Sequence, residues 1–172
     1  MAELTIFNTS KTLLECILAA LEEAGLPIPC RVCAVPGAIA WDDCGGGQLV
    51  VSTVREFQSE TFPLEALERG VNSSCGLPYL VAELTFSLLR CAPSPKGLST
   101  TVPCEDLEET SILLHRDAFH MRRALSCCLR DLKINYPTTE VLDYVVGATE
   151  RVGPEGGCVG NETTVLVGFF NG

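Results

Sequence analysis

The residues of this sequence best suited to chemistry are its ten cysteines. Cys30 and Cys33 form a Cys-x-x-Cys pair, and Cys44 follows eleven residues after Cys33. Thiolates at such spacing can bind zinc or form a redox pair. A structural zinc site usually adds a second Cys-x-x-Cys or a His-x-x-x-His, and none follows here at the spacing of a zinc ribbon or finger. Cys30, Cys33 and Cys44 are therefore candidate metal ligands in an incomplete set.

The expected local structure also argues against a thiol site. Cys30 and Cys33 fall in residues 28–35, a short β-branched segment bounded by prolines that is typical of a strand. Positions i and i+3 of a strand point to opposite faces. Cys127 and Cys128 are adjacent on an expected helix and point in different directions. We therefore favour buried thiols or disulfides over zinc or redox chemistry, since cysteine often packs as a small hydrophobic residue.

Other residue patterns for catalysis are incomplete as well. His115 and His120 are five residues apart on one expected helix, whereas zinc helices space them four apart so that both rings share a face. The sequence has no Gly-x-Ser-x-Gly elbow, no lysine of a phosphate-binding loop and no Gly-x-Gly-x-x-Gly that opens a helix. Asp42 and Asp43 precede three glycines at 45–47 without the further oxygens of a calcium loop, so we expect a turn. We expect no catalytic residue, no cofactor and no enzyme activity.

Charge and hydrophobicity limit the kind of protein. The chain of 172 residues carries 12 basic and 22 acidic side chains, a formal net charge of −10. Proteins that bind nucleic-acid phosphates tightly need clustered Lys and Arg, so the acidic composition disfavours tight binding of nucleic acid. Hydrophobic residues make up 47% of the chain, too many for a disordered protein. Residues 1–8 do not resemble a signal peptide and no run of about 18 apolar residues occurs, so we expect cytoplasmic folding with reduced thiols and no membrane contact.

Two helices are expected to position these residues. Residues 11–24 carry an apolar stripe at helical spacing, Thr12 and Glu15 match a capping box, and Gly25 supplies the stop. Residues 105–132 predict a long helix with acidic residues in its first turns and basic residues toward its end, as the helix dipole prefers. The apolar stripe of this second helix is Leu107, Leu114, Ala118, Met121, Leu125, Cys128 and Leu132.

Strand patterns occupy most of the remaining chain. Residues 79–91 are the clearest, since every second residue from Leu84 to Leu88 is apolar and polar residues lie between them. Residues 142–170 are typical of a closing hairpin with a glycine-rich turn. The segment 58–78 is long and rich in turn residues, and loops of that length are rarely passive in a compact domain.

The order of helix, three strands, helix and two strands predicts an α+β fold in a single domain, residues 1–172. We expect an antiparallel or mixed sheet of about five strands with both helices packed on one face. Residues 28–102 would supply three strands and long loops, and residues 142–170 the last two strands. The expected strands are 28–35, 48–57, 79–91, 142–152 and 158–170.

Three loop segments carry a resemblance to a known family. They are VPGAIAWDDCGGGQLVV at residues 35–51, LRCAP at 89–93 and VGPEGGCVG at 152–160. These segments resemble those of head-to-tail connector proteins of actinobacterial, mycobacteriophage-like siphophages, and within that group the chain most resembles the tail terminators. The resemblance runs from about Thr12 to the C-terminus. The expected order of helices and strands is also similar to that of the family.

The resemblance implies a structural virion protein that assembles as a homo-oligomeric ring, commonly a hexamer. Such a ring would cap the polymerised tail tube and join it to the neck at the head–tail junction, after assembly in the bacterial host cytoplasm. Its partners would be the tail tube protein and the head-to-tail stopper, and double-stranded DNA would pass through its lumen without specific binding. By analogy, subunit contacts would come from a sheet edge, the segment 58–78 and the closing hairpin. None of the family's residues is catalytic.

Two alternatives stay open. The head-to-tail stopper and other neck connector proteins of the same virion have comparable size, and sequence alone barely separates them. A protein of a different class, a small cytoplasmic zinc or thiol protein, would use Cys30, Cys33 and Cys44. The acidic balance fits the ring, because a lumen lined by carboxylates repels the phosphate backbone and lets DNA move. In a virion, the thiols would be open to oxidation once the particle leaves the cell.

Overall fold

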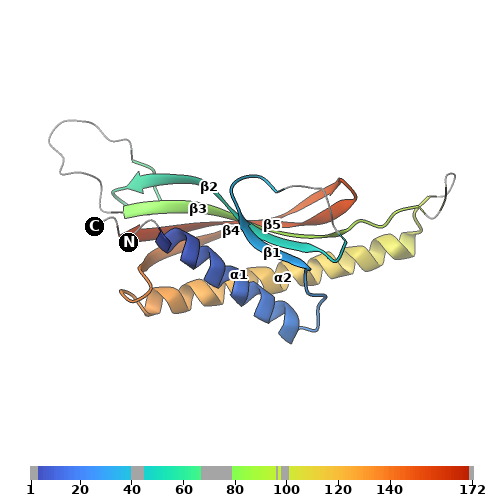
Figure 1. Cartoon of the computed structure of the whole chain (residues 1–172), viewed down its shortest axis with the longest axis horizontal. Helices are drawn as coiled ribbons and strands as arrows, with labels where there is room; N and C mark the ends of the chain where they lie inside the picture. Colours follow the sequence, from blue (N-terminus) through green and yellow to red (C-terminus); the bar gives the residue numbers. More distant parts are fainter. Residues whose placement is uncertain (1–3, 40–44, 67–78, 96, 98–100, 171–172) are drawn as a thin grey trace.

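The computed structural model of the chain describes residues 4–39, 45–66, 79–95, 97 and 101–170. Its helices and strands follow one another in the expected order (Figure 1). The helices are α1 (Thr5–Glu23) and α2 (Cys104–Ile134). The strands are β1 (Arg31–Val35), β2 (Gln48–Ser59), β3 (Tyr79–Cys91), β4 (Val141–Glu155) and β5 (Cys158–Phe170).

The five strands form one mixed sheet in the order β1-β2-β3-β5-β4. β1 pairs in parallel with β2, and the other neighbouring strands are antiparallel. This topology confirms the expected α+β fold with a sheet of about five strands. The closing hairpin is part of the sheet, because β5 lies between β3 and β4. β1 and β4 are therefore the edges of the sheet.

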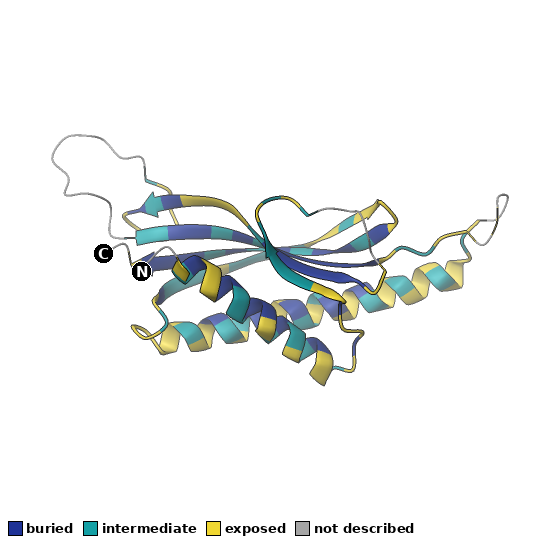
Figure 2. Ribbon diagram, in the orientation of Figure 1, coloured by how far each residue is buried: buried dark blue, intermediate teal, exposed yellow. Residues whose placement is uncertain are grey.

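Both helices lie on the same side of the sheet in Figure 1. Figure 2 shows the buried residues concentrated in the strands and along the sides of the helices that face them. Alternate residues of β3 point to this side, as the period-2 pattern predicts, and pack into one core with the helices. The fully buried members of this core include Leu13, Ile17 and Leu21 of α1, Leu84, Phe86 and Leu88 of β3, and Met121, Leu125 and Leu129 of α2.

α1 begins at Thr5, six residues before the start that the sequence pattern predicts. Thr12 lies inside the helix and donates its hydroxyl to the Asn8 carbonyl at 3.1 Å, so the predicted capping box is wrong. The apolar stripe extends back to Ile6, which is buried, and the buried Ser10 donates its hydroxyl to the Ile6 carbonyl at 2.8 Å. Because such polar residues bond to the backbone four residues earlier, they can be buried in a helix without an apolar pattern.

The C-terminal end of α1 is where the sequence predicts it. Gly25 N donates to Glu22 O at 3.0 Å and Leu26 N donates to Leu21 O at 2.9 Å, which is the Schellman pattern of helix termination. Gly25 has a φ of +64°, a left-handed conformation that glycine adopts without a Cβ clash. Leu26 is buried, so this turn also anchors the chain as it leaves α1 for β1.

The inner side of α2 starts later than the predicted stripe. Leu107 is 49% exposed, and the buried positions begin at Leu114. Figure 1 shows the N-terminal end of α2 projecting past the end of the β4–β5 hairpin, which explains the exposure of its first turns. Asp117 takes a fully buried position that the apolar stripe does not predict. Neither α2 nor the other helix in the described part of the chain is apolar enough to cross a membrane.

Candidate functional site

The candidate metal ligands lie in different surroundings. Cys30 lies one residue before β1, so the prediction that it belongs to the strand is wrong. Its N–H donates to Gly46 O at 3.0 Å, and its Sγ lies over this turn, where a Cβ on Gly46 would collide with it. Cys33 is half-buried within β1, and Cys44 lies outside the described residues. Within the described ranges, no group of three His, Cys, Asp or Glu side chains is arranged to hold a metal ion.

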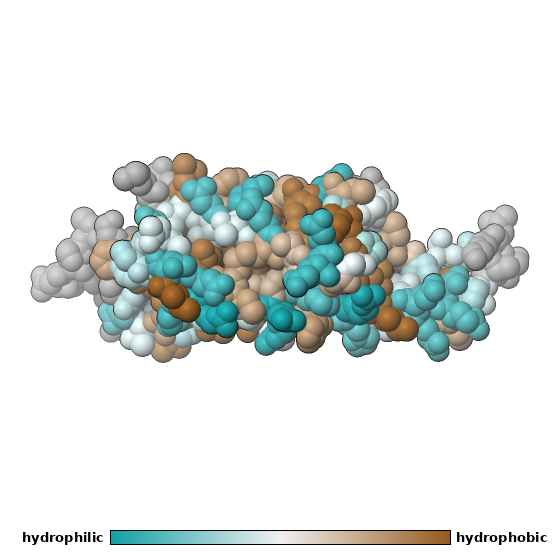
Figure 3. All heavy atoms as spheres, turned by 90° about the horizontal axis from the view of Figure 1, so that it is seen from below, coloured by the Kyte–Doolittle hydropathy of each residue, from teal (hydrophilic) through white to brown (hydrophobic). Residues whose placement is uncertain are grey.

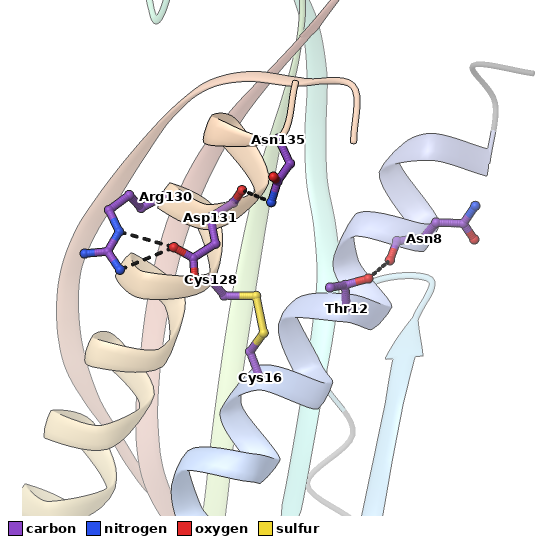
Figure 4. The surroundings of a disulfide bond; sticks show 7 residues. All are labelled: Asn8, Thr12, Cys16, Cys128, Arg130, Asp131 and Asn135. Carbon is purple, nitrogen blue, oxygen red and sulfur yellow. Dashed lines mark hydrogen bonds and ion pairs between the residues drawn. A yellow bond between two sulfur atoms is a disulfide. The ribbon is translucent and has the colours of Figure 1, made fainter. Parts of the chain in front are cut away.

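A disulfide joins the two helices. Cys16 of α1 and Cys128 of α2 are bonded, with a Cα–Cα distance of 6.4 Å and a separation of 112 positions in sequence. Figure 4 shows the bond crossing between the facing sides of the two helices. The sequence places Cys128 on the apolar stripe of α2 but does not single out Cys16. The pairing depends on α1 and α2 being neighbours, which the helical pattern of either segment does not reveal.

A groove of about 610 Å³ lies between α1 and α2 beside this disulfide. The exposed Cys127 and the half-buried His120 both line the groove. His115 has other surroundings, because its Nδ1 lies 2.9 Å from Arg151 Nη2 of β4. The two adjacent cysteines therefore differ: Cys128 forms the disulfide with Cys16, and Cys127 has an exposed thiol.

A buried ion pair connects α2 to the centre of the sheet. Arg90 of β3 donates from Nε to Asp117 Oδ2 at 2.8 Å and from Nη2 to Asp117 Oδ1 at 2.9 Å. The Arg90 side chain is 6% exposed and the Asp117 side chain is 0% exposed. Two parallel bonds of this kind fix both distance and orientation, so the pair sets the position of α2 over β3.

Two further polar side chains reach α2 beside the ion pair. Asn161 of β5 donates from Nδ2 to the Leu114 carbonyl at 3.0 Å, and Arg151 of β4 donates from Nη1 to the same carbonyl at 2.8 Å. Together with the ion pair, these bonds tie three neighbouring strands to one turn of α2. Asn161 Oδ1 is buried and has no hydrogen-bond partner among the described residues.

The side of the sheet opposite the helices carries carboxylates. Ser87 lies between two inward-facing residues of β3, so it points away from the helices. Its hydroxyl donates to Glu162 of β5 at 2.7 Å. Glu150 of β4 lies opposite Glu162 in the register, so two acidic side chains are cross-strand neighbours. This arrangement places negative charge on a face that no described helix covers.

Arg55 of β2 pairs with two other carboxylates. Arg55 binds Glu83 through Nε and Glu65 through Nη1, each at 2.6 Å. Its guanidinium also lies 4.8 Å from the centre of the Phe57 ring. The hydrogen bond to Glu83 is the largest cause that raises the pKa of Arg55 above its ordinary value, so this side chain stays charged.

Three segments that are far apart in sequence meet at one end of the sheet. β2 begins beside the end of β3, where Gln48 lies opposite Leu89. The end of β3 lies beside the start of β5, where Cys91 lies opposite Cys158. These positions belong to the segments 35–51, 89–93 and 152–160, whose residues carry the family resemblance.

A small second core holds these segments together. Leu89 and Cys158 are fully buried and pack with Ile39 and Val152. Each of the three segments contributes at least one of these four residues. We call Ile39, Leu89, Val152 and Cys158 the loop end of the sheet. Cys158 is thus a buried thiol that packs as a small hydrophobic residue. The thiols of Cys30, Cys104 and Cys127 are exposed, so the expectation of buried thiols is wrong for these three.

The chain was also compared with known proteins. No model of a protein family matches it, and no curated protein matches it significantly. The described geometry defines an α+β protein in which buried polar contacts and a disulfide fasten a long helix to a mixed sheet and to a second helix.

Proposed function

We propose that the chain is a structural assembly subunit. Its most buried polar contacts, the Arg90–Asp117 pair and the bond from Asn161 to the Leu114 carbonyl, connect helix to sheet. Such contacts maintain shape. The surfaces that remain are one sheet face, the edges β1 and β4, and the outer side of α2, and sheet edges are natural places for another chain to bind.

Within this class, the protein we propose is a tail terminator of a mycobacteriophage-like siphophage. It would form a ring, commonly a hexamer, that caps the tail tube and joins it to the neck, with DNA passing through the lumen. The observation that carries this proposal is the loop end of the sheet. All three segments that carry the resemblance contribute residues to this one small core.

Two other observations support the proposal. The order of helix, three strands, helix and hairpin is the order that the resemblance implies. The acidic face with Glu150 and Glu162 suits a surface that DNA passes without binding, because carboxylates repel phosphates. The segment 58–78, expected to contact a neighbouring subunit, folds back on β2 at its start, where Ala66 N donates to Gln58 O at 3.0 Å. Its residues 67–78 lie outside the described ranges.

The proposal is tested by mixing the purified chain with polymerised tail tube protein. Native mass spectrometry should show a ring of identical subunits, and negative-stain electron microscopy should show that ring at tube ends. A chain that stays monomeric and leaves the tube ends bare contradicts the proposal. A ring that binds the portal side of the neck and not the tube would instead be the result expected of a stopper.

A further inference from the structure

The outer side of α2 carries two large apolar side chains. Ile112 is 60% exposed and Phe119 is 61% exposed. They are seven residues apart, so they lie on the same side of the helix, about 10 Å apart along its axis. We call these two residues the apolar pair. Figure 3, which views the molecule from the helix side, shows apolar side chains as separate patches among polar ones.

Charged residues flank the apolar pair with opposite signs. Glu108 and Glu109 precede the pair, Arg122 and Arg123 follow it, and all four are exposed. The helix dipole favours acidic residues at the start of a helix and basic residues at its end, but this effect fades within one turn. Because Arg123 lies eleven residues before α2 ends at Ile134, the dipole does not account for the basic residues.

The spacing of these charges is symmetric about the apolar pair. Glu108 lies four residues before the pair and Arg123 lies four residues after it. Glu109 lies three residues before the pair and Arg122 lies three residues after it. A second α2 that runs antiparallel, with the two apolar pairs in contact, therefore brings Glu108 opposite Arg123 of the other copy. Glu109 and Arg122 flank the contact on opposite sides of the helix, and Arg122 bonds to the Gly147 carbonyl of β4.

We propose that the outer side of α2 binds a second copy of this chain, with the two α2 helices antiparallel. Glu108 of each copy faces Arg123 of the other, and the apolar pairs pack between these charges. The symmetry repeats every contact twice, so a pair of opposite charges lies at each end of the contact. This two-fold contact goes beyond the proposed function, since a ring closes through heterologous contacts that use other surfaces.

In a parallel arrangement of two α2 helices, fewer of these residues find an oppositely charged or apolar partner. To bring Glu108 opposite Arg122 of a parallel copy, the helices must shift by fourteen residues. That shift places Ile112 opposite Ser126 and leaves Phe119 without an apolar partner. The antiparallel arrangement brings the opposite charges together and the apolar pairs into contact at the same register, so the observations favour it.

The residues midway along the contact are held toward their own chain. His115 Nδ1 lies 2.9 Å from Arg151 Nη2, and Arg116 donates from Nη2 to the Ala24 carbonyl at 3.1 Å. These interactions draw both side chains away from the centre of the outer side. The apolar pair is therefore accessible to another helix.

Sedimentation velocity of the full chain over a concentration series tests the proposal. We expect a dimer whose share rises with concentration, in addition to any ring that the wild-type chain forms. Glu108→Lys or Arg123→Glu alone should raise the dimer dissociation constant roughly tenfold or more, because each places like charges opposite one another twice. Arg123 is the better residue to reverse, since Arg122 also bonds to the Gly147 carbonyl. Glu15→Lys, at an exposed position of α1, is the matched control and should leave the dissociation constant unchanged.

Two combinations separate loss of contact from a folding defect. A chain carrying both Glu108→Lys and Arg123→Glu should dimerise again, because the facing charges are again opposite. A mixture of the two single variants should form a heterodimer, although each variant alone is monomeric. A wild-type chain that is monomeric at every concentration overturns the proposal, and so does a dimer that neither reversal weakens. Both results leave the tail terminator proposal standing, because ring formation and tube capping are measured separately.

Discussion

Arg90 and Asp117 are the charged residues that position α2 over the sheet. Both are almost completely buried and bonded to one another through two hydrogen bonds. A buried pair of this kind adds little net stability compared with an apolar pair, but removing one partner is costly because the other keeps an uncompensated charge. The contribution of the pair is therefore best measured by breaking it from one side.

Replacing Asp117 with Ala should lower the free energy of unfolding by about 3–5 kcal/mol, because Arg90 would stay buried without its partner. Urea unfolding followed by circular dichroism measures this loss. The double replacement Arg90→Met with Asp117→Leu should cost less than Asp117→Ala alone. Asp131→Ala is the matched control: that side chain is 62% exposed and its contact with Arg130 should contribute below about 1 kcal/mol. Equal losses at Asp117 and Asp131 would contradict the role of the buried pair.

The sequence does indicate this pair, although a search for apolar stripes alone does not find it. Arg90 continues the inward series of β3 that runs from Leu84 to Leu88, and Asp117 lies three residues after Leu114 on the inner side of α2. A charged residue at an inward position needs a buried partner. Two such residues of opposite charge on different elements therefore predict one another. The hydrogen-bond geometry could not be predicted, because it depends on how α2 crosses the sheet.

At the scale of elements, the end of α1 depends on the backbone of a single glycine. Gly25→Ala should lower the free energy of unfolding by about 1 kcal/mol, because φ is +64° and a Cβ disfavours that conformation. A Cβ at Gly25 would meet no atom within 4 Å, so the loss comes from the backbone alone. Gly37→Ala is the control, since that position is equally open and has no positive φ. Thermal unfolding of both variants should separate them, and equal melting temperatures would contradict the Schellman ending of α1.

The disulfide between α1 and α2 closes a long loop. Cys16→Ser should lower the free energy of unfolding by about 3–5 kcal/mol, since crosslinking residues 112 apart removes much entropy from the unfolded chain. Added reductant should destabilise the wild-type chain by a similar amount and leave Cys16→Ser unaffected. Cys127→Ser is the adjacent control and should remain sensitive to reductant. If the stability of Cys127→Ser no longer depended on reductant, Cys16 would be bonded to Cys127 and not to Cys128, which would contradict the structure.

Most elements could be predicted from local patterns, whereas their pairing could not. The bounds of β3 match the predicted strand, because its alternation of apolar and polar residues is regular. The sequence predicts an antiparallel or mixed sheet and does not reveal that β1 pairs in parallel with β2. Parallel neighbours need a crossover of about a dozen residues, and the segment between β1 and β2 is long enough, but length alone does not determine direction.

At the scale of the whole molecule, the loop end links the sequence resemblance to the fold. Leu89 and Cys158 each pair with residues more than forty positions away in the chain. Their packing with Val152 and Ile39 joins β3, β4 and β5 to the segment after β1. The resemblance identifies the three segments in the sequence, but only the fold shows that they lie together. The function itself stays a proposal that assembly experiments must test.

The proposed function is that of a ring that closes the tail tube at the head–tail junction. Cryo-electron microscopy of the parent virion tests it most directly. We predict a ring at that junction whose subunits fit α1, α2 and the five-stranded sheet, with the DNA path through its centre. A particle whose density at the junction does not fit this fold, or a virion that lacks the chain altogether, would contradict the claim.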